Sequence, residues 1–243
     1  MAIDLNGVII DSVSVTSSSN FKKSIVTEGL ICHLDASNAN SYPGSGTVWY
    51  DLTVPFKNDV TIYGGTPFTT VGGQPAFNFT ADGHYMNKSS FSNFPTTTLT
   101  YEIWLYPAAS EITSGDRGTL ILCNGGSGAY MSITKDTVKQ SNYWYSHTPE
   151  GYHESTSAVS RGSWHHFCCV WDNSNVHQWT DGNYGKVFGV SGTSTANNNL
   201  IIGRESSGRQ FSGAIAVVRI YNRALAGAEV LNNFYALRGR FGI

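Results

Sequence analysis

The densest apolar segment of the chain, Trp164–Trp171, contains only aromatic, β-branched, small apolar and histidine residues. Apolar residues at both odd and even positions are typical of a strand that is covered on both faces in a layered β structure. Turn-forming residues at 172–175 follow, a return strand is expected at 176–180, and Asp181-Gly182 predicts a type I′ hairpin turn. The segment therefore predicts a buried meander, so functional residues are expected on the loops around it.

The same pattern predicts about a dozen short strands, separated by turns rich in glycine. They are expected at 29–34, 59–63, 76–79, 85–86, 99–106, 119–123, 130–134, 143–147, 163–171, 176–180, 186–190, 200–203 and 214–221. One helix is predicted, at 226–237, because its apolar residues recur at helical spacing. The predicted fold is all-β: a two-sheet antiparallel β-sandwich with a short C-terminal helix.

Residues 1–24 stand apart from the predicted domain, which covers 25–243. Their apolar positions are Ile3, Leu5, Val8, Ile9, Ile10, Val13 and Val15, and a joint of threonine, serine and asparagine at 16–20 follows them. The segment is either an extra edge strand of the domain or a strand-like arm that attaches it to something larger. It lacks the basic region and long apolar core of a secretory signal peptide, so none is expected.

The composition argues against two classes of partner, nucleic acids and membranes. Charged residues make up only 13% of the 243 residues and the net charge is −2, so neither nucleic acid nor a membrane surface is an expected partner. No apolar run is long enough to span a membrane. The four cysteines form no CxxC motif, and Cys168 and Cys169 are adjacent on one predicted strand, so all four are expected to be reduced.

Several of these segments resemble one known family, the laminin-G-like, concanavalin A-like jelly rolls. The resemblance is carried by 29–36, 41–52, 164–172, 180–182, 200–203 and 211–225, and it spans about 25–237. It implies a jelly-roll fold, and the family often binds calcium or glycans. The tail at 229–242 further resembles versions found in structural proteins of tailed bacteriophages.

The family's acidic segments correspond to Phe79–Tyr85 and Ile215–Arg219 in this chain. Only Asp82 remains acidic there, and it is out of register with the family's pattern. Calcium takes six to eight oxygen ligands, with carboxylates among them. The chain is therefore expected to bind no metal and no other cofactor, although the family often uses calcium.

The sequence contains no recognisable set of catalytic residues. Glycosidases need two carboxylates at a fixed separation, and the nearest pair, Glu150 and Glu154, lies in a predicted loop that would not hold it. His165 and His166 should face opposite ways along a strand, so they cannot readily chelate one zinc ion. Ser163 and Ser174 are near histidines only in sequence. The chain is expected not to be an enzyme.

One aromatic cluster is a candidate contact site for a glycan or a partner chain. It consists of Tyr143, Trp144, Tyr145, His147 and Tyr152. On a strand, alternate residues of this cluster would form one face that enters the core and another that offers rings for stacking. Burial of both faces is the alternative.

These observations predict a non-enzymatic virion component of a phage, a capsid or tail decoration or accessory protein on the virion surface that is assembled in the host cytoplasm. Its partners would be major capsid or tail subunits, or further copies of itself in a homo-oligomer. Ile3, Leu5, Val8, Ile9 and Ile10 are the candidate attachment residues. The alternative is a carbohydrate-binding adhesin that recognises a host surface glycan, and a glycoside hydrolase is a remote third, because fold does not imply function.

Overall fold

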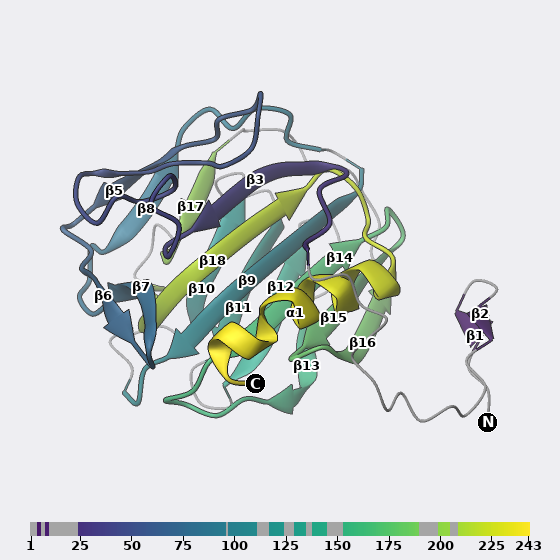
Figure 1. Ribbon diagram of the computed structural model, residues 1–243. Helices are drawn as coiled ribbons and strands as arrows, with labels where there is room; N and C mark the ends of the chain where they lie inside the picture. Colours follow the sequence, from purple (N-terminus) through teal and green to yellow (C-terminus); the bar gives the residue numbers. More distant parts are fainter. Residues whose placement is uncertain are drawn as a thin grey trace.

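The computed structural model describes residues 4–5, 8–9, 24–95, 97–110, 117–123, 129–134, 138–144, 153–189, 199–204 and 209–243. From residue 24 onward these form a two-layer β-sandwich with one C-terminal helix (Figure 1). The front sheet has the strand order β16 (Asn183–Gly189), β15 (Asn175–Thr180), β14 (His165–Trp171), β9 (Leu99–Pro107), β18 (Gly213–Tyr221), β7 (Gln74–Phe79) and β6 (Phe68–Val71), with β3 (Leu30–Asp35) also paired to β18.

The back sheet has the strand order β13 (His153–Ala158), β12 (Lys139–Trp144), β11 (Ala129–Thr134), β10 (Arg117–Cys123), β17 (Leu200–Ile202), β8 (Tyr85–Lys88), β5 (Val60–Tyr63) and β4 (Val48–Trp49). All pairings within both sheets are antiparallel. The predicted antiparallel sandwich is therefore confirmed. In the N-terminal segment, β1 (Asp4–Leu5) and β2 (Val8–Ile9) pair with each other.

Strand β14 lies between β9 and β15 in the middle of the front sheet, and all seven of its residues are buried. Phe167 and Trp171 pack into the core between the sheets, whereas Cys168 and Val170 pack on the opposite face. The prediction that this strand is covered on both faces is confirmed. Burial of apolar side chains on both faces makes β14 a rigid base for the loops at its ends.

The turn between β15 and β16 has the geometry that the sequence predicted. Asp181 has φ of 51° and Gly182 has φ of 73°, and Thr180 is directly opposite Asn183 across the hairpin. Two consecutive positive φ angles define a type I′ turn, whose twist matches that of the flanking strands. This turn fixes the position of the Asp181 carboxylate.

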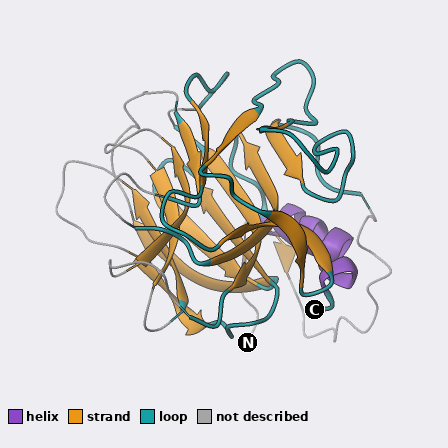
Figure 2. Ribbon diagram, turned by 90° about the vertical axis from the view of Figure 1, so that its left-hand side faces the viewer, coloured by secondary structure: helices purple, strands orange, loops and turns teal. Residues whose placement is uncertain are grey.

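Helix α1 (Gly227–Phe241) lies against the outer face of the front sheet (Figure 2). The Glu229 carboxylate accepts a hydrogen bond from the Ala226 amide (2.9 Å) and stabilises the first turn. At the other end, Gly242 adopts φ of 73°, which terminates the helix. The helix extends four residues beyond the predicted end because Phe241 stacks on Trp104 of β9, with 4.3 Å between ring centroids.

A polar network is buried between this helix and the front sheet. Arg219 donates to Glu102 over 2.7 Å, and Asn233 of α1 donates to the second oxygen of the same carboxylate over 2.8 Å. The side-chain nitrogen of His166 lies 3.3 Å from Glu102, and Asn233 also donates to the Tyr221 hydroxyl over 2.9 Å. The network ties α1 to β9, β14 and β18.

Three strands were not predicted: β4, β6 and β13. They lie at or near sheet edges, and the sequences of β6 and β13 are polar, so they lack the apolar alternation that identifies a half-buried strand. The strand predicted at 143–147 begins earlier, at Lys139, and is described as far as Trp144. Its polar first half is held by backbone pairing with β11, which no local sequence pattern shows.

The described cysteine side chains, Cys32, Cys168 and Cys169, are buried and not in disulfides. Burial raises the pKa of Cys169 to about 12, and burial together with the nearby Glu102 raises that of Cys168 as well. These thiols are therefore unreactive packing groups. The side chain of Cys123 lies outside the described residues. Within the described part of the chain, no helix is long and apolar enough to cross a membrane.

Candidate functional site

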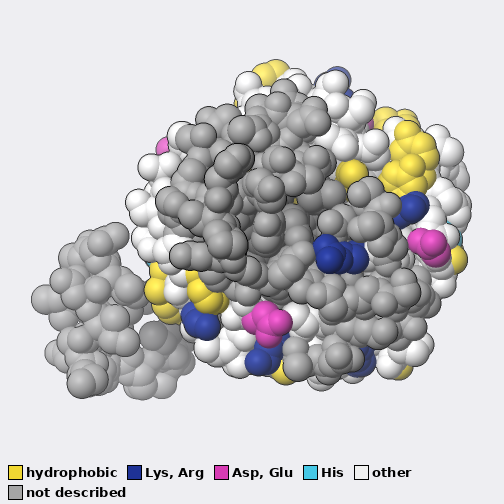
Figure 3. Space-filling view, turned by 180° about the vertical axis from the view of Figure 1, so that it is seen from behind, with side chains coloured by type: hydrophobic (Ala, Val, Ile, Leu, Met, Phe, Trp, Pro, Cys, Tyr) yellow, Lys and Arg dark blue, Asp and Glu magenta, His cyan; other side chains and the backbone are white. Residues whose placement is uncertain are grey.

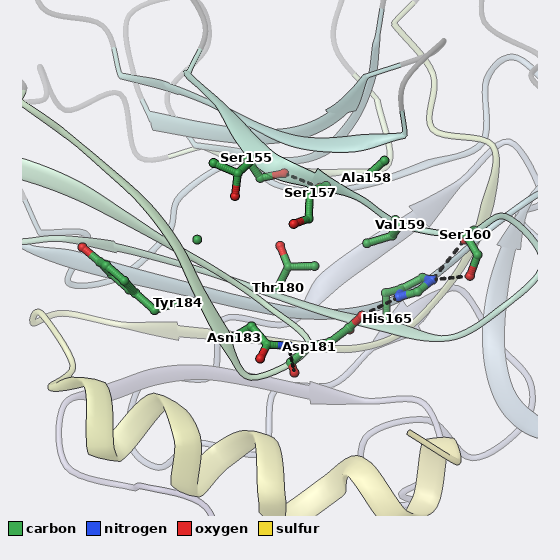
Figure 4. A pocket seen from close by; sticks show the side chains of 12 residues that line it. Ser155, Ser157, Ala158, Val159, Ser160, His165, Thr180, Asp181, Asn183 and Tyr184 are labelled. Carbon is green, nitrogen blue, oxygen red and sulfur yellow. Dashed lines mark hydrogen bonds and ion pairs between the residues drawn. The ribbon is translucent and has the colours of Figure 1, made fainter. Parts of the chain in front are cut away.

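A groove, called the edge groove below, opens where one edge of the back sheet faces one edge of the front sheet (Figure 4). Its volume is about 270 Å³. Strand β13 and the loop after it form one wall, and the β15–β16 hairpin forms the other. The lining residues are Ser155, Thr156, Ser157, Ala158, Val159, Ser160, His165, Thr180, Asp181, Asn183, Tyr184 and Gly185.

Hydroxyl groups dominate the middle of the groove. Ser155 and Ser157 come from β13 and Thr180 comes from β15, so both sheets contribute hydroxyls to the same space. Ser155 is buried and donates to the carbonyl oxygen of Ser157 over 2.9 Å, which braces the β13 wall. Hydroxyls both donate and accept hydrogen bonds, so this wall can pair with either kind of group on a ligand.

One end of the groove carries a paired histidine and aspartate. The Asp181 carboxylate lies 2.7 Å from Nδ1 of His165, and its other oxygen accepts a hydrogen bond from the His166 amide over 2.8 Å. Nε2 of His165 lies 3.1 Å from the Ser160 hydroxyl (Figure 4). Serine, histidine and aspartate thus occur in the order of a nucleophilic triad.

The surroundings of His165 argue against that chemistry. The carbonyl oxygen of Ser160 lies 3.0 Å from the same Nε2 atom. A carbonyl oxygen only accepts hydrogen bonds, so it favours a proton on Nε2, and a nitrogen that carries a proton cannot remove the proton of the Ser160 hydroxyl. In this arrangement His165 joins the loop after β13 to the hairpin turn, as a clamp between the two walls.

Tyr184 lies at the other end of the groove, but its ring is on the outer face of the front sheet, because it is directly opposite Trp179, which packs on that face. Tyr184, in edge strand β16, has 48% of its surface exposed, an unusually large fraction for an aromatic residue in this chain. Its ring packs edge-on against buried Trp179, with 4.9 Å between the ring centroids. Figure 4 shows Tyr184 and His165 at opposite ends of the groove. The site therefore has a hydroxyl-rich middle and one end where His165 pairs with Asp181.

The described lining residues include no lysine or arginine. On the back face of the molecule, the charged side chains of the described residues are scattered rather than gathered into a patch of one sign (Figure 3). The low charge noted in the sequence thus extends to the groove. A ligand of this site would meet dipoles and one hydrogen-bonded histidine and aspartate instead of a field of fixed charge.

The predicted contact cluster lies mostly outside the described residues. Tyr143 and Trp144 belong to β12, where their backbones pair with Tyr130 and Ala129 of β11. Their side chains, and Tyr145, His147 and Tyr152, are not described. Of the candidate attachment residues, Leu5, Val8 and Ile9 belong to β1 and β2, and Ile3 and Ile10 lie outside the described residues.

The sequence pattern did not predict a site at the groove residues, and Asp181 was interpreted only as a turn residue. The missed signal was the hydroxyl-rich run Ser155–Ser160 just before the buried strand β14. The prediction for the histidine pair is confirmed: His165 faces the groove, whereas His166 faces α1, where its ring packs on Trp104. No group of three or more His, Cys, Asp or Glu side chains in the described residues is placed to hold a metal ion.

Comparisons with solved structures show proteins of the same fold. Domain 4 of AbnA, an extracellular arabinanase from Geobacillus stearothermophilus that was solved in complex with arabinotriose, matches with a TM-score of 0.62 and 17% identity. The match covers 84% of this chain and 97% of that domain. The binding domain of Paraclostridial Mosquitocidal Protein 1 matches with a TM-score of 0.64 and 13% identity over 85% of this chain and 52% of that one.

The Trypanosoma rangeli sialidase matches with a TM-score of 0.61 and 15% identity, over 88% of this chain and 33% of the sialidase. This chain thus spans about a third of the sialidase and about half of the toxin domain. No curated protein sequence is significantly similar to it. The family model described as the concanavalin A-like lectin/glucanases superfamily matches residues 79–231, which is more than half of the chain. The chain therefore belongs to the concanavalin A-like lectin/glucanases superfamily.

Proposed function

We propose that this protein is a non-catalytic carbohydrate-binding domain and that the edge groove is its binding site. The observation that carries the proposal is the composition of the groove: hydroxyl, amide and carboxylate groups from both sheets. A sugar presents the complementary chemistry, because the hydroxyls around its rim both donate and accept hydrogen bonds.

The size of the groove fits this ligand. Its volume of about 270 Å³ is slightly below the range of roughly 300–1,000 Å³ for sites of drug-sized molecules. One or two sugar rings would fill it, so the groove suits the end of a glycan or one branch. The complex of AbnA domain 4 with arabinotriose adds support from the fold, although that likeness alone assigns no ligand to this chain.

Blocking the groove tests this function. Ser157 lies on edge strand β13 with its side chain exposed, so Ser157→Trp should fill the groove at little cost to stability. For a glycan identified on an array, this variant is expected to bind at least tenfold more weakly by calorimetry. Thr70→Trp, at an exposed position of β6 on the opposite edge of the front sheet, is the matched control and should bind normally. Equal affinity of both variants would contradict the proposal.

The absence of catalysis is tested separately at Ser160. Because the Ser160 carbonyl oxygen beside Nε2 of His165 favours a proton on that atom, the Ser160 hydroxyl should not be activated. A fluorophosphonate probe is therefore expected to leave the folded protein unlabelled in intact-mass spectra. Stoichiometric labelling that disappears in both Ser160→Ala and His165→Ala would instead identify a serine hydrolase.

The virion role stays a second candidate, and it is compatible with carbohydrate binding in one molecule. It is supported by the resemblance of the tail at 229–242 to phage structural proteins and by the apolar N-terminal segment. In this role, residues 1–24 would attach the domain to another virion subunit through strand addition. Deleting residues 1–20 should then abolish loading onto particles without changing the melting temperature of the domain.

A further inference from the structure

One histidine on the helix side of the front sheet has a buried ring nitrogen without a partner. His33 of β3 is directly opposite Arg219 of β18, so its side chain lies on the face that carries the buried Glu102 network. Nε2 of His33 is buried and has no hydrogen-bond partner among the described residues, whereas its backbone amide donates to the Asp51 carboxylate over 2.8 Å. Nε of Arg219 and Nη2 of Arg240 are buried donors that also lack an acceptor among the described residues. A proton on Nε2 would therefore add one more donor where acceptors are already too few.

The carboxylates that act on His33 already have cationic partners. Glu102 accepts a hydrogen bond from Arg219 over 2.7 Å. Arg240, in the last turn of α1, donates to both oxygens of Asp35 over 2.9 Å each. If His33 took up a proton, three cations would lie beside two carboxylates on this side of the sheet.

These surroundings lower the pKa of His33 from 6.5 to about 4. Burial is the largest cause and the Arg219 charge is the next, while Arg240 acts in the same direction. The charges of Asp35 and Glu102 raise the pKa but are outweighed. A form in which His33 is exposed would bind a proton near pH 6.5, whereas the packed form binds it only near pH 4. The packed form is therefore fully favoured above pH 6.5 and loses stability as the pH falls from 6.5 to 4.

The last turn of α1 is the part of this region that can move at the lowest cost. His33 and Arg219 belong to strands that are paired to each other within the front sheet. Arg240 is held to the sheet by side chains, and its own side chain is already 19% exposed. Moving Arg240 into water would remove one of the three cations and free Asp35 to pair with protonated His33.

We propose that His33 makes the docking of α1 sensitive to acid: on mild acidification its ring takes up a proton, and residues 234–241 of the helix leave the front sheet. Release would also affect the edge groove, because the Phe234 ring packs against Gly182 in the β15–β16 turn. The inference does not depend on the proposed function, since release of the helix is measured without a ligand.

The other histidine on this face, His166, would act in the opposite direction. Its Nε2 atom lies 3.3 Å from the Glu102 carboxylate. A proton on that atom would therefore add an attraction to Glu102 rather than a repulsion. Loss of docking in mild acid is for this reason assigned to His33.

The test is hydrogen exchange followed by mass spectrometry at pH 7.5 and pH 5, corrected for the intrinsic pH dependence of amide exchange. In the parent protein, protection of residues 234–241 is expected to fall by up to about thirtyfold at pH 5, which is the linkage effect of a pKa that changes between 4 and 6.5. Protection of β14 should change little, because the sheet stays intact. An equal loss in β14 would indicate general unfolding and would overturn the inference.

Two variants and a control assign the effect. In His33→Gln the side chain cannot be protonated, so the fall should be less than about threefold. Arg240→Gln leaves His33 in place and frees Asp35, so protection should be lower at pH 7.5 but again change less than about threefold at pH 5. His84→Gln is the control, because burial also lowers the pKa of His84, which precedes β8 in the back sheet, and this variant should respond like the parent. A parent that keeps its protection at pH 5, or an undiminished fall in either test variant, would overturn the inference.

Discussion

Replacing Arg219 with methionine is expected to lower the free energy of unfolding at pH 7 by about 3–5 kcal/mol. Arg219 and Glu102 each expose only 1% of their surface and form an ion pair of 2.7 Å beneath helix α1. Without the guanidinium, Glu102 would remain as a buried carboxylate whose main counter-ion has been removed. The measurement is equilibrium unfolding in urea.

The pH dependence distinguishes this mechanism from simple loss of packing. Burial opposes ionisation of Glu102, but Arg219 and His166 outweigh it and hold the pKa of Glu102 at about 2. In the parent protein this stabilisation is present above the ordinary pKa of 4.5 and is lost as the pH falls towards 2. In Arg219→Met, burial should raise the pKa of Glu102, so the deficit should be larger at pH 7 than at pH 4.

The control is the double variant Glu102→Leu with Arg219→Met, which removes both charges and should recover much of the lost stability. A deficit for Arg219→Met below 1 kcal/mol, or one that is equal at pH 7 and pH 4, would show that the pair does not act in this way.

Replacing Phe234 with alanine is expected to lower the free energy of unfolding by about 3–5 kcal/mol, as for other buried aromatic residues. Phe234 of α1 is 4% exposed, and its ring is parallel to that of Trp104, with 5.9 Å between centroids. It also supports the hairpin turn, because a Cβ atom placed on Gly182 would lie 2.5 Å from its ring. The loss should appear in urea unfolding.

Because Gly182 follows Asp181 in the turn, Phe234→Ala should also weaken glycan binding although it lies outside the groove. Phe234→Leu retains most of the volume and should cost less than half as much stability. Normal stability of Phe234→Ala would mean that α1 does not hold the hairpin against the front sheet.

The sequence predicted those elements that are specified by their local pattern of apolar and turn-forming residues. Strand β14 was recognised because both of its faces are apolar, and the following hairpin because Asp181-Gly182 suits a type I′ turn. The end of α1 was predicted four residues too early, since the Gly239 region is polar and only the contact between Phe241 and Trp104 extends the helix.

The edge groove was not predictable in the same way, because it is assembled by pairing between distant segments. Strand β13 is polar and exists through its pairing with β12, and only the sandwich brings it beside the β15–β16 hairpin. No single stretch of sequence encodes this arrangement.

The central claim, that the edge groove binds a glycan, is tested most directly by titrating the ¹⁵N-labelled protein with the glycan that the array identifies and recording amide chemical shifts. The largest shifts are predicted at Ser155–Ser160 and at Thr180–Gly185, with little change at Tyr63 or along β6. Shifts that gather on the back sheet around Tyr63 and Tyr85, with the groove amides unmoved, would contradict the claim and place the binding site elsewhere.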